Sequence, residues 1–148
     1  MAQPAQVALS NSESLPEIRH VPPEYIVSIW WLVAPGVEKT LRFDTEGRTA
    51  QDLLDGLLAR KEFLTLGFRG DEFIGFSVSW IDRPKGIWHI DLLYSEDNFQ
   101  YDALSLLEDA ARNEGATAIV FGSKRRGFEK LSKQLGFKEN YVSYRKEL

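Results

Sequence analysis

The chain has 148 residues, a formal net charge of −4 at pH 7, two histidines and no cysteine. This length predicts one domain, and the missing thiols exclude disulfides, thiolate metal sites and cysteine nucleophiles. We expect no metal, no strong nucleic-acid binding and no membrane insertion, because histidines are scarce, the charge is mildly acidic and no apolar run could span a bilayer.

The first part of the chain combines a polar tail with a long helix. Residues 1–17 are rich in Ala, Gln, Ser and Pro, which predicts a tail that is flexible or ordered by a partner. The domain is expected to cover residues 18–148, with a first strand at residues 18–21. Pro23 then opens a helix that we expect to end near Pro35. Its apolar face is formed by Ile26, Ile29, Trp30 and Val33.

A second helix is predicted after a segment whose secondary structure the sequence leaves open. Residues 37–43 are compatible with either a helix or a strand. Thr49 and Asp52 then have the spacing of a capping box, which marks a helix N-terminus. The predicted apolar face of this helix is formed by Leu53, Leu54, Leu57 and Leu58.

The middle of the chain predicts three antiparallel strands and a crossover helix. Residues 63–68 and 73–81 read as strands joined by a hairpin turn at Gly70, where a positive φ costs little. Residues 87–94 alternate like a half-buried strand, and a helix follows with apolar residues at helical spacing between Ala103 and Ala111.

The last part predicts a strand, a helix and a final strand. Gly115 is a candidate helix C-cap, and residues 118–122 form a short apolar strand. A last helix is expected to end at Gly136, and residues 141–148 alternate like a closing strand. Strands and helices in this order favour an α/β fold, with a mixed sheet and helices on both faces.

This order, with Leu135-Gly136-Phe137 closing the last helix, resembles the GNAT superfamily of N-acetyltransferases. The resemblance implies a mixed, mostly antiparallel sheet of six or seven strands flanked by about four helices. The run from Ser123 to Phe128 is similar to small GNAT-like proteins of tailed phages, including the internal virion type of short-tailed phages. That likeness implies protein partners in virion structure or assembly. The N-terminus lacks a secretory pattern, so we expect the virion or the host cytoplasm.

The segment that binds the CoA diphosphate in this superfamily is altered here. The usual Arg/Gln-x-x-Gly-x-Gly/Ala turn corresponds to residues 98–103, where only Ala103 matches. Tyr101 replaces a glycine that lets main-chain N–H groups approach the diphosphate, and Asp102 adds negative charge. Ser132 stands where the resemblance implies a tyrosine acid. We therefore expect no cofactor and a protein without strong catalysis, acting through protein contacts.

The alternative is an acetyl-CoA-dependent N-acetyltransferase. His89 and Asp91 share one strand face, pointing away from Trp88, Ile90 and Leu92, and either could act as the base for an amine substrate. They could equally line a wet sheet face or a partner contact. Cofactor contacts would come from the backbone of Leu93 and Tyr94 and from the side chains of Lys124, Arg125 and Arg126.

Two features point to contact surfaces. Three cations at the start of a helix oppose its dipole, so residues 124–126 suggest an anionic partner, or else a solvated basic turn. Trp30, Trp80 and Trp88 fit buried positions, whereas Trp31 cannot share the face of Trp30 and would mark a contact surface if exposed.

Overall fold

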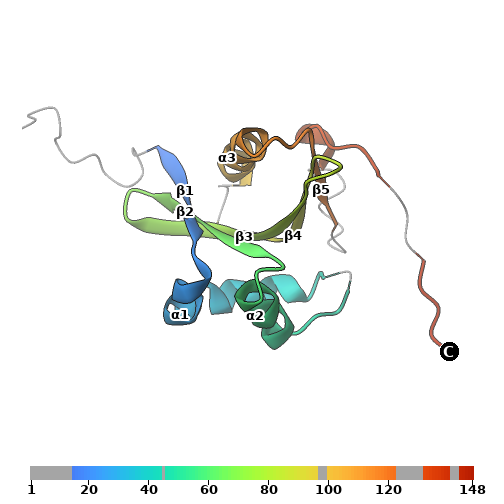
Figure 1. Cartoon of the computed structure of the whole chain (residues 1–148), viewed down its shortest axis with the longest axis horizontal. Helices are drawn as coiled ribbons and strands as arrows, with labels where there is room; N and C mark the ends of the chain where they lie inside the picture. Colours follow the sequence, from blue (N-terminus) through green and yellow to red (C-terminus); the bar gives the residue numbers. More distant parts are fainter. Residues whose placement is uncertain (1–14, 45, 97–99, 123–131, 141–143) are drawn as a thin grey trace, which may run out of the picture.

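The computed structural model describes residues 15–44, 46–96, 100–122, 132–140 and 144–148. In this part of the chain a five-stranded sheet has α1 and α2 on one face and α3 on the other (Figure 1). The predicted α/β class and the mostly antiparallel sheet are confirmed. Among the helices of these residues, none combines the length and apolarity needed to cross a membrane.

The strands follow one another in sheet order β1-β2-β3-β4-β5. All neighbours are antiparallel except β4 and β5, which are parallel. The parallel pair is possible because α3 lies between them in sequence and returns the chain. The strands are β1 Pro16–Val21, β2 Phe63–Arg69, β3 Glu72–Asp82, β4 Ile87–Ser95 and β5 Ala118–Phe121.

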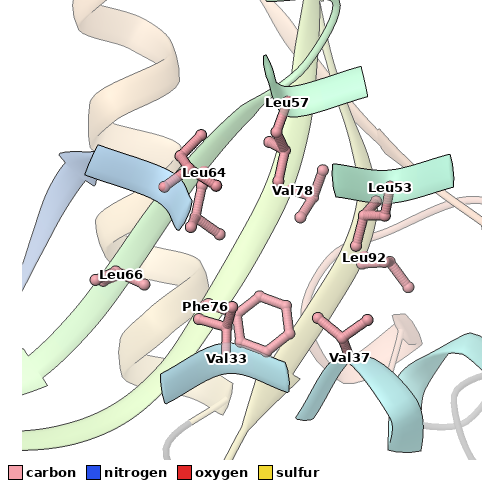
Figure 2. Close-up of a cluster of buried hydrophobic side chains, with 10 residues drawn as sticks. Val33, Val37, Leu53, Leu57, Leu64, Leu66, Phe76, Val78 and Leu92 are labelled. Carbon is pink, nitrogen blue, oxygen red and sulfur yellow. The ribbon is translucent and has the colours of Figure 1, made fainter. Parts of the chain in front are cut away.

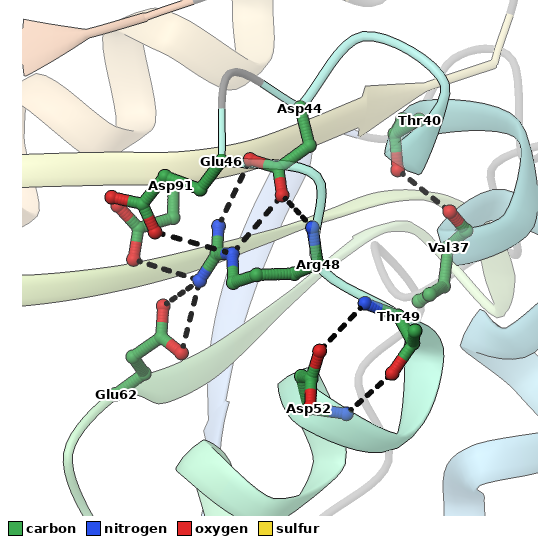
Figure 3. A network of polar contacts seen from close by, with 9 residues as sticks. All are labelled: Val37, Thr40, Asp44, Glu46, Arg48, Thr49, Asp52, Glu62 and Asp91. Atoms are coloured by element: carbon green, nitrogen blue, oxygen red, sulfur yellow. Dashed lines mark hydrogen bonds and ion pairs between the residues drawn. The ribbon is translucent and has the colours of Figure 1, made fainter. Parts of the chain in front are cut away.

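Within the described residues, three helices flank this sheet, and residues 132–134 add a short helical turn. They are α1 Pro23–Leu41, α2 Ala50–Leu58 and α3 Gln100–Asn113. The predicted capping box is present: Asp52 N–H donates to the Thr49 hydroxyl, and Thr49 N–H donates to the Asp52 carboxylate (Figure 3). This reciprocal pair satisfies two donors that the helix start would otherwise leave unpaired.

The expected count of six or seven strands is higher than the five found in the described residues. Part of the predicted last strand, residues 141–143, lies outside the described residues. Residues 144–148 form no strand, and the Tyr144 side chain is 90% exposed. Their alternation has no buried face to support it, which explains why the pattern misled.

The expectation that α1 ends near Pro35 is wrong. The helix continues through Pro35 to Leu41. Gly36 and Val37, just after the proline, are buried, and Val37 packs into the core with Val33. A proline inside a helix costs a hydrogen bond, so burial of the last turns against the sheet outweighs that local preference.

Gly36 marks the closest approach of α1 to the sheet, and Gly36→Ala should therefore lower the free energy of unfolding. A Cβ at this position would lie 2.7 Å from Phe76 Cε1 and 2.9 Å from Tyr94 Cδ2. Alanine favours a helix by about 1 kcal/mol, but overpacking costs about 1–3 kcal/mol. We expect a net loss of up to about 2 kcal/mol in urea unfolding. Ser28→Ala, on the exposed side of α1, is the control and should change little. A stabilised Gly36→Ala variant would contradict the tight packing.

The sheet divides two hydrophobic clusters. On the face covered by α1 and α2, called the α1/α2 face, Figure 2 shows side chains from both helices meeting those of β2, β3 and β4. On the opposite α3 face, a smaller cluster joins α3 to β4. The first contains Val33, Val37, Leu53, Leu57, Leu64, Leu66, Phe76, Val78 and Leu92, and the second Trp88, Ile90, Leu107, Ala111 and Ala116. The cluster to which a strand residue belongs thus shows on which face of the sheet its side chain lies.

Candidate functional site

Strand β4 contains a β-bulge at Asp91. Val78 of β3 pairs with Leu92, but Ser79 pairs with Ile90, so Asp91 is an extra residue without a Cα partner in β3. Ile90 packs on the α3 face, whereas Leu92 packs on the α1/α2 face. Bulges change the direction of side chains and are frequent beside functional sites.

The bulge corrects one detail of the predicted strand. His89 does point away from Trp88 and Ile90, because these two pack on the α3 face. Leu92, however, lies on the same face as His89 and Asp91 and not opposite to them. A strict two-residue period across residues 87–94 cannot represent the inserted residue.

The pairing of β4 with β5 ends where the bulge begins. Their register runs from Ile87 opposite Ala118 to Ile90 opposite Phe121. Among the described residues, no strand pairs with residues 91–95 on this side of β4. Leu93 and Tyr94, the predicted main-chain contacts for a cofactor, lie in this segment. An extended ligand could add main-chain hydrogen bonds to such an edge.

Beside the bulge, Arg48 joins four carboxyl groups from separate parts of the chain (Figure 3). Its guanidinium lies 3.2 Å from Asp44 and 3.2 Å from Glu62. Asp91 is 3.6 Å away and Glu46 3.7 Å away. The Arg48 main-chain N–H also donates to Asp44 at 2.8 Å. The Arg48 guanidinium thus connects the segment between α1 and α2 with the starts of α2 and β2 and with the bulge.

This environment changes the pKa of the carboxyl groups in opposite directions. Burial raises the pKa of Glu62 to about 8, helped by a hydrogen bond and the charge of Asp91 and opposed by Arg48. Burial also acts to raise the pKa of Asp44, but hydrogen bonds from Arg48 outweigh it and the net pKa is lowered. Near neutral pH, Glu62 therefore holds a proton beside Asp91.

His89 and Asp91, the two predicted candidate bases, have different neighbours, and His89 contacts an aromatic ring. Its ring stacks on Trp80 with a centroid distance of 3.9 Å and an interplanar angle of 1°. Asp91 instead contacts Arg48 and Glu62. Trp80 is 36% exposed, so the expectation that it is a core residue is wrong, whereas Trp88 is fully buried as predicted. Trp31 is 73% exposed, as its place beside Trp30 indicated.

The predicted phosphate contacts Lys124, Arg125 and Arg126 lie outside the described residues, as do residues 98 and 99 of the altered turn. Ser132 lies in the short helical turn at residues 132–134. The expectations about the diphosphate therefore stay predictions.

Sequence reasoning missed Arg48, Glu62 and Asp44 as site residues. Each stands just outside a helix or strand, where charged residues are common. The available signal was weak: the alternation of β4 breaks at Leu92–Leu93, which can indicate a bulge next to Asp91. Which charges meet there depends on how α1 and α2 pack, and no spacing along the chain encodes it.

Solved structures resemble this fold over nearly its whole length. A ribosomal-protein-alanine N-acetyltransferase from Brucella melitensis biovar Abortus 2308 has a TM-score of 0.62 at 16% identity, covering 90% of this chain and 99% of that protein. AAC(6′)-Iy in complex with the bisubstrate analogue CoA-S-monomethyl-acetylneamine has a TM-score of 0.58 at 21% identity, covering 91% and 100%. An aminoglycoside acetyltransferase from an uncultured soil metagenomic sample, in complex with sisomicin, has a TM-score of 0.62 at 11% identity, covering 90% and 97%.

No protein-family model matches the chain, and no curated protein is similar to it in sequence. The structural likeness shows the fold: this chain has the GNAT-like α/β fold of N-acetyltransferases. At these identities the likeness does not extend to the reaction or the substrate.

Proposed function

We propose that this chain is an acyl-CoA-dependent N-acyltransferase in which the Glu62–Asp91 pair takes the proton of a primary amine. The observation that carries the proposal is that three features coincide: the bulge at Asp91, the end of the β4–β5 pairing, and the half-buried carboxyl pair of Glu62 and Asp91. The structurally similar proteins named above include acetyltransferases of amines, which supports the same reaction class.

The chemistry of the acceptor explains why such a pair is useful. A primary amine is protonated at neutral pH, and only its neutral form is a nucleophile. A base works best when its pKa is near the working pH. Glu62, with its pKa raised to about 8, meets this condition better than an ordinary carboxylate. Its ionised Oε accepts the ammonium proton, and Arg48 holds the resulting carboxylic acid beside Asp91.

The residues around β4 match only part of what a binding site for acetyl-CoA needs. The main chain of β4 near Leu93 and Tyr94 is suited to an extended pantetheine arm, because β5 has stopped pairing there. Bound acetyl-CoA would supply the activated thioester. The turn at residues 98–103 lacks the usual glycines, so we propose that Lys124, Arg125 and Arg126 bind the phosphates through their side chains.

A second candidate function is a non-catalytic role in virion structure or assembly through protein contacts. The observation that favours it is the outer side of α1, where Tyr25, Val27 and Trp31 are all exposed. Exposed aromatic groups of this kind often mark contact surfaces. Asp102 of the altered turn favours the same reading, because its charge would repel a diphosphate.

Calorimetry with acetyl-CoA decides between these candidates. We expect the native chain to bind it, and the Lys124→Ala/Arg125→Ala/Arg126→Ala variant to raise Kd about 10-fold or more, because charge-assisted bonds to phosphates are lost. The charge-matched control is Lys138→Ala/Arg145→Ala/Lys146→Ala, whose residues are exposed. An absence of binding, together with no CoA release in the presence of primary amines, would overturn the acyltransferase proposal and favour the contact role.

A further inference from the structure

We propose that Trp80 and His89 form an aromatic floor for the amine acceptor, so that the preferred acceptor carries its primary ammonium group on a ring or on a short arm of a ring. This inference rests on the acyltransferase proposal and names the class of its acceptor. The ring would lie against the stacked pair while its ammonium group points toward Asp91 and Glu62.

The floor lies on the α1/α2 face, next to its hydrophobic core. Phe76 and Val78 of β3 belong to the core on this face, and strand alternation places Trp80 next in the same row. Beyond the core, Trp80 keeps 36% of its surface exposed although His89 is stacked against it. A large ring that stays exposed after stacking offers apolar surface for a ligand.

The floor is next to the carboxyl groups. His89 precedes Asp91 by two residues on the same face of β4, a span of about 7 Å. This is the size of a six-membered ring with an attached amine. A ring on the floor would therefore bring its ammonium group to the bulge, where the proposed proton acceptor lies.

The charge around the bulge is complementary to a cation. Asp44, Glu46, Glu62 and Asp91 surround a single guanidinium, that of Arg48. An ammonium group would balance this excess of carboxyl groups. A linear polyamine would gain the charge contacts but would leave the flat surface of the floor unused. The combination favours an ammonium group attached to a ring.

Steady-state kinetics with three amines tests the floor. Kanamycin supplies an aminosugar ring, tyramine an aromatic ring with an ethylamine, and spermidine a linear polyamine. We expect one of the two ring amines to have the highest kcat/KM, and Trp80→Ala to raise its KM about 10-fold while the KM for acetyl-CoA is unchanged. Trp80→Phe keeps a ring and should behave nearly as the native chain. Trp31→Ala, which removes an exposed tryptophan from α1, is the control and should have no effect.

His89→Phe separates stacking from proton transfer. It keeps a ring on Trp80 and removes both ring nitrogens, so kcat should stay within about 3-fold, whereas losing a general base costs about 100-fold or more. A large fall in kcat in His89→Phe, an unchanged KM in Trp80→Ala, or a preference for spermidine would each contradict the proposed aromatic floor.

A chain without turnover would contradict the acyltransferase proposal but would still test the floor. Calorimetric titration of the native chain and of Trp80→Ala with kanamycin and tyramine then gives the answer. Binding of a ring amine that weakens about 10-fold in the variant supports the floor. Equal affinities for the two proteins, or no binding to either, would overturn it.

Discussion

Arg48→Met should lower the free energy of unfolding by about 3–5 kcal/mol at pH 7, measured by urea unfolding. The guanidinium contacts Asp44, Glu62 and Asp91, and the side chains of Arg48 and Asp44 are only 18% and 3% exposed. Methionine fills similar space but leaves the carboxylates of Asp44 and Asp91 without their shared cation. The cost comes from uncompensated charge in a place with little water.

Arg112→Met is the matched control. Arg112 lies 3.2 Å from Asp109, the same distance as Arg48 from Asp44, but its side chain is 69% exposed. Exposed pairs contribute about 0–1 kcal/mol, so this variant should unfold almost as the native chain does. If both variants lost equal stability, burial of the Arg48 cluster would not be the cause. Arg48→Lys should fall between native and Arg48→Met, because it keeps the charge but loses the fork that reaches several carboxyl groups.

Local signals in the sequence were sufficient for much of the fold. The capping box at Thr49 and Asp52 forms as predicted because both partners lie within one helical turn. Gly70 and Gly115 have the positive φ values that their turn and cap require, 61° and 84°. These features depend on neighbours along the chain, so short patterns describe them completely.

The errors arose where distant parts of the chain decide the structure. Pro35 ends a helix in isolation, but here the burial of Gly36 and Val37 against the sheet carries α1 on to Leu41. The bulge at Asp91 depends on the pairing of β4 with β3, because the register between the two strands shifts there. Local preference is weak in comparison with such packing, and register depends on both strands.

The candidate site was predictable only in part, for the same reason. Sequence alone pointed to His89 and Asp91, since both stand on one face of a strand. It could not show that Trp80 stacks on His89, or that Glu62 and Arg48 meet Asp91. Those contacts join β3, β4 and the starts of α2 and β2. Of the two predicted bases, our proposal therefore keeps Asp91, which it pairs with Glu62, and places His89 beside Trp80 instead.

Glu62→Gln should lower kcat/KM for an amine by about 100-fold to 10,000-fold, because the proposed base is lost. In the native chain kcat/KM should rise with pH through the pKa of Glu62, about 8, since only the ionised carboxylate accepts a proton. That rising limb should disappear in Glu62→Gln. Glu114→Gln is the control: Glu114 is an exposed carboxylate paired with Arg83 at 3.2 Å, and its loss should leave the profile unchanged. A rising limb that persists in Glu62→Gln would assign the proton to another group.

The same substitution should stabilise the fold at alkaline pH. Folding raises the pKa of Glu62 from 4.5 to about 8, so the folded chain holds this proton more tightly than the unfolded chain. The resulting stability is fully present below pH 4.5 and is lost as pH rises through about 8. Glutamine remains neutral, so the advantage of Glu62→Gln over the native chain should grow by about 4 kcal/mol between pH 5 and pH 9. Urea unfolding at both pH values measures it. A pH-independent difference would mean that Glu62 is ionised throughout, and a carboxylate of that kind would be too weak a base for an ammonium group.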